Sequence, residues 1–298
     1  MLRIFRQYLV AKVMNNKLKS QLICFVIYII AFLIPLFLIP SSISNVWMII
    51  LIWHIYATLF IYVGSLLLKN SSLYDPFWSV APIPIVLYMV NISSNSLIIK
   101  LLILFPILFW GVRLTHNWLM GWKGFKHEDF RYIDLKNTNK IQAEINNLFG
   151  IHLLPTLIVN FSLFPISYIL LNNLNLNINL LLASIFSIVA VILETISDKQ
   201  MRDFKSNPLN KDKTMKYGLW RYSRHPNYLG ESMFWFGVYF MGLSSGIMPI
   251  WTILCPLVML SLFIFISCPM MDKRSLKNRP DYQDYMNKTS QLFLWPPK

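Results

Sequence analysis

The sequence predicts an all-α protein whose helices form a polytopic transmembrane bundle of seven or eight spans. Hydrophobic residues make up 56% of the chain and charged residues 13%, whereas a typical soluble domain has about 25% charged residues. The apolar residues fall into runs long enough to cross the roughly 30 Å hydrocarbon core of a bilayer as helices. The positive charges lie between alternate runs, as the positive-inside rule predicts for a membrane protein.

Eight apolar runs are predicted to be spans. The first follows a basic segment, residues 1–20, which carries five cations and no acid. This segment is too long for the basic region of a signal peptide and no cleavage motif follows, so we expect a retained span. The third, fourth and seventh runs are short, and the last two are also compatible with a helical hairpin that turns at Gly242 to Pro249. The runs lie at about 21–40, 46–68, 77–92, 97–112, 149–171, 179–197, 232–245 and 248–269.

The charges predict that both termini are cytoplasmic. With eight spans, every one of the 27 Lys and Arg residues except Lys100 then lies on the cytoplasmic side, and Lys100 is close enough to a helix end to reach the interface. The Asp and Glu residues lie on the same side, so one face of the helix bundle holds nearly all of the ionisable side chains. The membrane would be the endoplasmic reticulum in a eukaryote or the inner membrane in a bacterium. A channel or porter needs polar groups at the midplane; the main one here is His54, interpreted as a hydrogen-bonded core histidine.

The net charge of +14 does not indicate a nucleic-acid partner, because no soluble basic module remains once the spans are removed. The three cysteines, Cys24, Cys255 and Cys268, lie in apolar runs without the spacing of metal ligands, so they are interpreted as buried hydrophobic residues. We therefore expect no metal site. The partners expected are membrane lipids and a lipid-like small-molecule substrate.

Residues 217–231 concentrate charged and aromatic side chains at the start of an apolar run. Pro226 disfavours helical backbone at His225 and is suited to the first turn of a helix. Arg224 and His225 then lie just before a helix N-terminus, where free N–H groups and the helix dipole favour an anion. We interpret the segment as a phosphate or pyrophosphate cradle. The alternative is a basic cluster attracted to anionic lipid, which would need Lys or Arg but not the other residues of the segment, Trp220, Asn227, Tyr228 and Glu231.

The end of the sixth span offers a second set of ionisable side chains. Glu194, Asp198, Arg202 and Lys205 are spaced to share one helix face. A simple ladder of ion pairs explains Asp198 with Arg202. It explains Glu194 poorly, because Glu194 lies a full turn deeper in the apolar run, where a carboxylate is a candidate functional residue.

Two further cytoplasmic segments leave alternatives open. The loop with Glu128-Asp129-Phe130-Arg131-Tyr132 is either a solvated amphipathic loop with local ion pairs or part of a site. The tail, residues 272–298, is either a solvated cytoplasmic tail or, as its tyrosine pair and aromatic ending suggest, a segment that folds back onto the bundle.

These segments resemble, in order and spacing, the steroid 5-alpha-reductase-like membrane proteins of the DUF1295 family, which are distantly related to isoprenylcysteine carboxyl methyltransferases. The resemblance is specific over residues 218–231 and covers about residues 75–298. It implies a family domain at residues 71–298, after an N-terminal part, residues 1–70, with the basic segment and two spans. The sequence departs from the family at Ser267-Cys268-Pro269, where relatives often have Ser-Gly-Pro.

The resemblance implies that NADPH binds in a cavity open to the cytosol. It implies that Asn227, Tyr228 and Glu231 contact the cofactor and that Arg224 and His225 face its phosphates. The full set of cofactor-binding residues expected is Arg131, Glu194, Asp198, Lys205, Arg221, Arg224, His225, Asn227, Tyr228 and Glu231.

We therefore expect an NADPH-dependent reductase of a C=C bond conjugated to a carbonyl in a lipid-like or steroid-like substrate. Such chemistry needs an acid near the carbonyl oxygen as enolate charge develops, and the catalytic candidates are Asp75 and Tyr228. Asp75 has an alternative role as the N-cap of a helix with Pro76 at its first position. Two other functions remain open: a membrane methyltransferase that uses S-adenosylmethionine, since related enzymes share an Arg-His-Pro-x-Tyr element, and a non-catalytic protein that keeps the fold.

Overall fold

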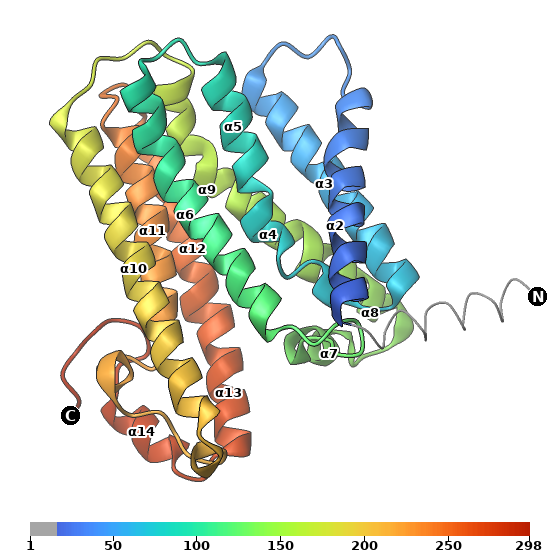
Figure 1. Ribbon diagram of the computed structural model, residues 1–298, viewed down its shortest axis with the longest axis vertical. Coiled ribbons are helices and arrows are strands. Elements are labelled where there is room, and N and C mark those ends of the chain that lie inside the picture. Colours follow the sequence, from blue (N-terminus) through green and yellow to red (C-terminus); the bar gives the residue numbers. More distant parts are fainter. Residues whose placement is uncertain (1–16) are drawn as a thin grey trace, which may run out of the picture. The chain divides into compact units, whose positions relative to one another are not determined.

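A computed structural model describes residues 17–298, which form a series of helices (Figure 1). No strand occurs in this part of the chain, where the one β-bridge joins Ser223 to Ser290. The predicted all-α fold is thus confirmed. Three cations of the expected basic segment, Arg3, Arg6 and Lys12, lie outside the described residues. The α-helices are α2 (Lys17–Leu33), α3 (Val46–Leu68), α4 (Phe77–Val80), α5 (Pro82–Ile92), α6 (Leu97–Gly121), α7 (Phe130–Lys136), α8 (Lys140–Ile145), α9 (Leu154–Leu170), α10 (Ile178–Ser206), α11 (Pro226–Leu243), α12 (Leu254–Leu262), α13 (Cys268–Asn278) and α14 (Tyr282–Lys288).

Within residues 17–298, seven helical runs are long and apolar enough to cross a membrane, so the chain is an integral, multi-pass membrane protein. The run expected at 232–245 is helical, as part of α11, but is not among the seven; Asn227, Glu231 and Ser232 lower the hydropathy of its first turns. The predicted hairpin is confirmed, because α11 is followed by a turn and a second long helical run. The seven runs are Lys17–Phe37, Val46–Leu68, Ser71–Ile92, Leu97–Gly121, Lys140–Leu170, Ile178–Ser206 and Ile250–Asn278.

The described chain divides into two compact units. The first comprises residues 17–88 and 111–161, and the second comprises residues 89–110 and 162–298. In the first unit, α2, α3 and α4 enclose an apolar core in which Phe77 is fully buried. His54 is also fully buried, and its Nδ1 lies 3.3 Å from the side-chain nitrogen of Asn160. The interpretation of His54 as a hydrogen-bonded core histidine is confirmed.

In the second unit, α10 and α11 pack against each other along their length. Glycines on α11 allow this close approach: a Cβ at Gly230 would lie 2.8 Å from Cβ of Glu194, and one at Gly237 would lie 2.1 Å from Oγ of Ser187. Small residues at a contact let two helix backbones come close in a membrane. The tight packing fixes the first turn of α11 beside the last turns of α10.

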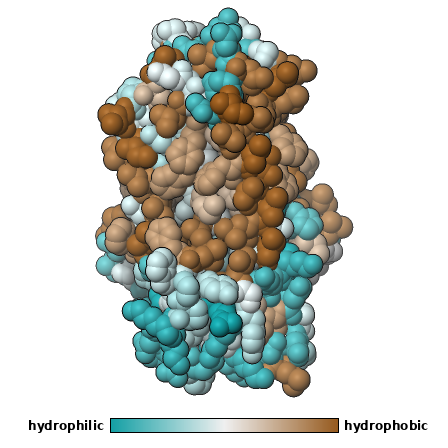
Figure 2. Space-filling view, turned by 90° about the vertical axis from the view of Figure 1, so that its left-hand side faces the viewer, coloured by the Kyte–Doolittle hydropathy of each residue, from teal (hydrophilic) through white to brown (hydrophobic). Residues whose placement is uncertain are grey.

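Most of the charged residues of the second unit gather at one end. Figure 2, which looks at the left-hand side of Figure 1, shows apolar side chains over the middle of this face, a large hydrophilic area at its lower end and a smaller one at its top. Figure 1 places α14 and the end of α10 there. This end carries the segment 217–231 that the sequence singled out.

Candidate functional site

The segment that leads into α11 is anchored on α10. Gly218 has a positive φ of 59°, and a Cβ there would lie 2.5 Å from the side-chain oxygen of Gln200. That oxygen accepts a hydrogen bond from the backbone N–H of Leu219 at 3.0 Å. Trp220 then donates its indole N–H to the carbonyl of Ser197 at 3.0 Å. Glycine is required at 218 because both the backbone conformation and the space exclude a side chain.

The tail folds back onto this segment, as one of the two alternatives predicted. The backbone N–H of Arg224 donates to the carbonyl of Ser290 at 2.8 Å, and the hydroxyl of Ser223 donates to the carbonyl of Leu292 at 2.6 Å. The chain before α11 is thus held between α10 on one side and the tail on the other.

Asp272, on α13, joins the tail to the start of α11. Its buried carboxylate accepts from Nη2 of Arg224 at 2.9 Å, lies 2.9 Å from Nε2 of His225, and accepts from the hydroxyl of Tyr282 at 2.5 Å. Burial and the nearby carboxylate raise the pKa of Tyr282, so the phenol remains a donor. Nη1 of Arg224 donates to two carbonyls of the tail, at 2.9 and 3.0 Å. Both terminal guanidinium nitrogens of Arg224 are therefore engaged by the protein itself.

A cavity of about 220 Å³ lies between these elements. It brings together six of the predicted site residues, namely Asp198, Lys205, Arg224, His225, Asn227 and Tyr228. The tail adds four residues that the sequence did not assign to the site: Ser275, Arg279, Tyr282 and Tyr285. The Arg-Pro-Asp-Tyr run at 279–282 was visible in the sequence, but its place beside α10 depends on the fold.

Two polar atoms of the cavity-lining residues are buried without a hydrogen-bond partner among the described residues. They are the side-chain oxygen of Asn227, an acceptor, and Nε of Arg224, a donor. The ring of Tyr228 stacks on His225 at 5.5 Å and on Phe263 at 5.0 Å, which fixes its orientation. A buried donor or acceptor without a partner is uncommon in proteins, so these atoms fit a ligand that supplies complementary groups.

Three predicted residues of the second unit do not line this cavity. The buried carboxylate of Glu231 accepts from the indole N–H of Trp110, at 2.9 and 3.0 Å, and from that of Trp235 at 2.8 Å. Glu231 thus takes part in helix packing. Glu194 is buried at the contact between α10 and α11, and Arg221 is exposed.

The remaining predicted residues, Asp75 and Arg131, belong to the first unit. Asp75 accepts a hydrogen bond from the hydroxyl of Tyr132 at 2.6 Å. Arg131 binds Asp129 through two hydrogen bonds, of 2.9 and 3.0 Å. The alternative role of Asp75 as an N-cap is wrong, because Pro76 occupies the N-cap position of α4 and no side chain caps that helix. The carboxylate of Asp75 instead binds Tyr132 and so holds the first turn of α7.

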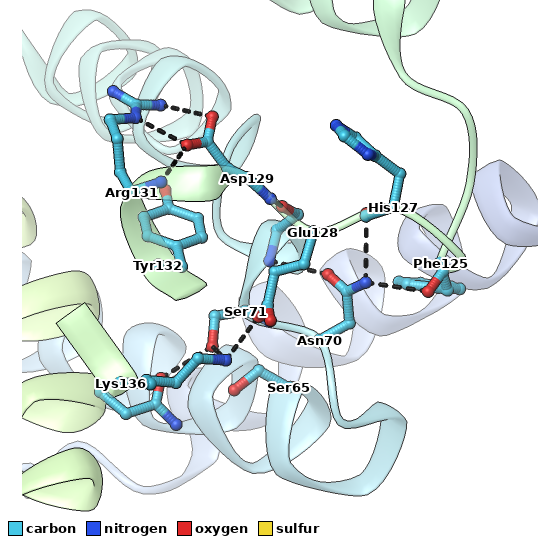
Figure 3. A network of polar contacts seen from close by, with 12 residues as sticks. Ser65, Asn70, Ser71, Phe125, His127, Glu128, Asp129, Arg131, Tyr132 and Lys136 are labelled. Carbon is cyan, nitrogen blue, oxygen red and sulfur yellow. Dashed lines mark hydrogen bonds and ion pairs between the residues drawn. The ribbon is translucent and has the colours of Figure 1, made fainter. Parts of the chain in front are cut away.

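Figure 3 shows that the loop around residues 125–136 is tied to the end of α3 rather than simply solvated. The side-chain nitrogen of Asn70 donates to the carbonyl of Phe125 at 2.9 Å, and the backbone N–H of Ser71 donates to Glu128 at 2.6 Å. Lys136 also binds Glu128, at 2.5 Å. The Glu-Asp-Phe-Arg-Tyr motif therefore has an anchoring role in the first unit.

Fold and site together define a multi-pass α-helical membrane protein with a polar, cation-lined cavity in its second unit. The chain belongs to the DUF1295 family, described as "Protein of unknown function (DUF1295)", whose model matches residues 59–289. It is 28% identical over 254 residues to the uncharacterized protein C594.04c of Schizosaccharomyces pombe, a match that covers 76% of this chain and 73% of that protein. No solved structure matches the chain. The expected membership in DUF1295 is confirmed, while the relationships to steroid reductases and methyltransferases stay predictions.

Proposed function

We propose that the protein is an NADPH-dependent reductase of a C=C bond conjugated to a carbonyl group in a lipid-like substrate. The observation that carries the proposal is the cavity beside the start of α11. It combines the cations Lys205 and Arg279 with a buried acceptor on Asn227 that has no hydrogen-bond partner among residues 17–298. A phosphate-bearing ligand with hydrogen-bond donors complements this set.

The residues of the cavity fit this cofactor. Lys205 and Arg279 would face its phosphates, while the side-chain oxygen of Asn227 would accept from a ribose hydroxyl or the carboxamide. The ring of Tyr228 is held between two other rings and would restrict the orientation of the ligand in the cavity. When bound, NADPH would supply the hydride that, with one proton, saturates the C=C bond.

An enone develops negative charge on its carbonyl oxygen as its double bond is reduced, and a hydrogen-bond donor near that oxygen lowers the barrier. Among the cavity-lining residues, we assign this role to the hydroxyl of Tyr228. Asp75, the other predicted catalytic residue, is engaged by Tyr132 in the first unit. Its role in catalysis stays a prediction.

The charge of the cavity disfavours the methyltransferase alternative. S-adenosylmethionine carries a positive sulfonium, which the ammonium of Lys205 and the guanidinium of Arg279 would repel. In a protein that binds no ligand, the buried side-chain oxygen of Asn227 would stay unpaired. An unpaired buried acceptor costs about 1–3 kcal/mol of stability, which disfavours a non-catalytic role.

The test is ligand binding by the whole protein purified in detergent, followed through its unfolding temperature. Saturating NADPH, at a hundred times its dissociation constant, should stabilise the fold by about 2.7 kcal/mol. Asn227→Ala should weaken NADPH binding, whereas Asn278→Ala, at the exposed end of α13, should not. A response to S-adenosylmethionine alone would contradict the proposal, and so would no response to either ligand. With NADPH bound, consumption of the cofactor across a panel of lipid enones then identifies the substrate.

A further inference from the structure

A second cavity, of about 300 Å³, adjoins the first at the end of α10. The two cavities share four lining residues, namely Met201, Lys205, Met215 and Arg279. The other residues of the second cavity come from the end of α10 and from the turn that follows it. That turn adds Lys211 and Lys213, so four cations face this cavity and no Asp or Glu lines it.

These four cations have no carboxylate in direct contact in the described part of the chain, although Asp198 lies near enough to attract Lys205. None of Lys205, Lys211, Lys213 and Arg279 makes an ion pair within the described chain. Nearby Lys216, by contrast, binds Asp281 at 2.8 Å. Cations that share a cavity repel one another, and an anion placed among them relieves that repulsion.

The turn that presents the lysines is held in place by its own hydrogen bonds. The side chain of Asn210 donates to the carbonyl of Phe204, the last turn of α10, at 2.9 Å. The side chain of Asn207 accepts from the backbone N–H of Leu209 at 3.0 Å, and the backbone N–H of Lys213 donates to the carbonyl of Asn210 at 3.1 Å. Lys211 and Lys213 therefore project from a defined backbone beside the first cavity.

We propose that the second cavity binds the phosphate monoester on the ribose of NADPH, so that Lys211 and Lys213 determine a preference for NADPH over NADH. This inference rests on the proposed function. A phosphate monoester carries a charge of about −1.5 to −2 at neutral pH, and it would form charge-assisted hydrogen bonds with the lysines. NADH lacks this phosphate, so the second cavity would add nothing to its binding.

The test compares NADPH and NADH binding to the full-length protein in detergent, measured by calorimetry at fixed, low salt. The unsubstituted protein should bind NADPH at least tenfold more tightly than NADH. The double variant Lys211→Gln/Lys213→Gln should lose most of that preference by weakening NADPH binding alone. The control Lys273→Gln/Lys277→Gln removes the same charge from the exposed side of α13, outside both cavities, and should keep the preference.

The outcomes separate the two claims. Equal binding of both cofactors by the unsubstituted protein, or an equal loss of both in the lysine variant, overturns the inference while the proposed function stands. Failure to bind either cofactor overturns both. A lipid headgroup is another source of a phosphate monoester. Binding of the protein to phosphatidylcholine vesicles with and without phosphatidate tests that alternative. If the lysine variant loses phosphatidate binding but retains its NADPH preference, the cavity is a lipid-headgroup site and the inference is wrong.

Discussion

At the scale of single residues, the carboxylate of Asp272 is shared by three partners: Arg224, His225 and Tyr282. Asp272→Asn should destabilise the protein by about 3 kcal/mol, because it leaves the largely buried guanidinium of Arg224 without its counterion. Detergent-solubilised protein unfolded by denaturant measures this loss. The exposed Asp284 provides the control, since Asp284→Asn should change stability by less than about 0.5 kcal/mol. Equal effects of the two substitutions would contradict the role given to Asp272.

Asp281 gives a pH-dependent contribution to stability. Burial raises its pKa, but the hydrogen bonds from Lys216 and from Thr214, at 2.8 and 2.6 Å, outweigh burial and hold the pKa below its ordinary value of 3.8. A carboxylate with a lowered pKa in the folded state stabilises that state above about pH 4, and this stability is lost as the pH falls through the lowered pKa. The unfolding temperature of the wild type should therefore exceed that of Asp281→Asn at pH 6, and the difference should shrink below pH 4. A difference that does not change with pH would refute this assignment.

At the scale of secondary structure, the contact between α10 and α11 positions the cavity. Gly237→Ala should destabilise the protein by about 1–3 kcal/mol, because the new methyl group overlaps Ser187 and the helices must separate. Adding Ser187→Gly should restore part of the loss. Gly150→Ala is the control, since no atom lies within 4 Å of the added carbon. Unfolding in denaturant measures all three variants, and a Gly237→Ala protein as stable as the wild type would show that the packing is looser than described.

At the scale of the whole molecule, the distribution of positive charge predicts which end of each unit faces the cytoplasm. α10 has 29 residues and so a length of about 43 Å, which separates Asn173 from Lys211 by the width of a bilayer. A membrane-impermeant maleimide applied to intact cells should label Asn173→Cys, and label Lys211→Cys only after the membrane is opened. The native cysteines are buried, so background labelling should be low. The reverse pattern would contradict the predicted orientation.

The fold class, the family and the start of α11 could all be predicted from the sequence alone. In a bilayer, a long apolar run can form only a few kinds of structure, because every backbone N–H and C=O group needs a hydrogen-bond partner within the protein. Pro226 restricts the backbone around it, so the start of α11 can be predicted without knowing which segments pack against that helix. The sequence also pointed to six residues that the structure gathers around one cavity. They could be found because they lie at the end of one predicted helix and at the start of the next.

Which charged side chains face that cavity, and which bind other parts of the protein, depends on how the helices and the tail pack in three dimensions. Glu231 and Asn227 lie one helical turn apart, yet Glu231 is engaged by two tryptophans while Asn227 lines the cavity. Arg224 was expected to face phosphates, but it binds Asp272, 48 residues further along the chain. The partner of a buried charge is chosen by packing between distant segments, and local sequence patterns carry no information about that choice.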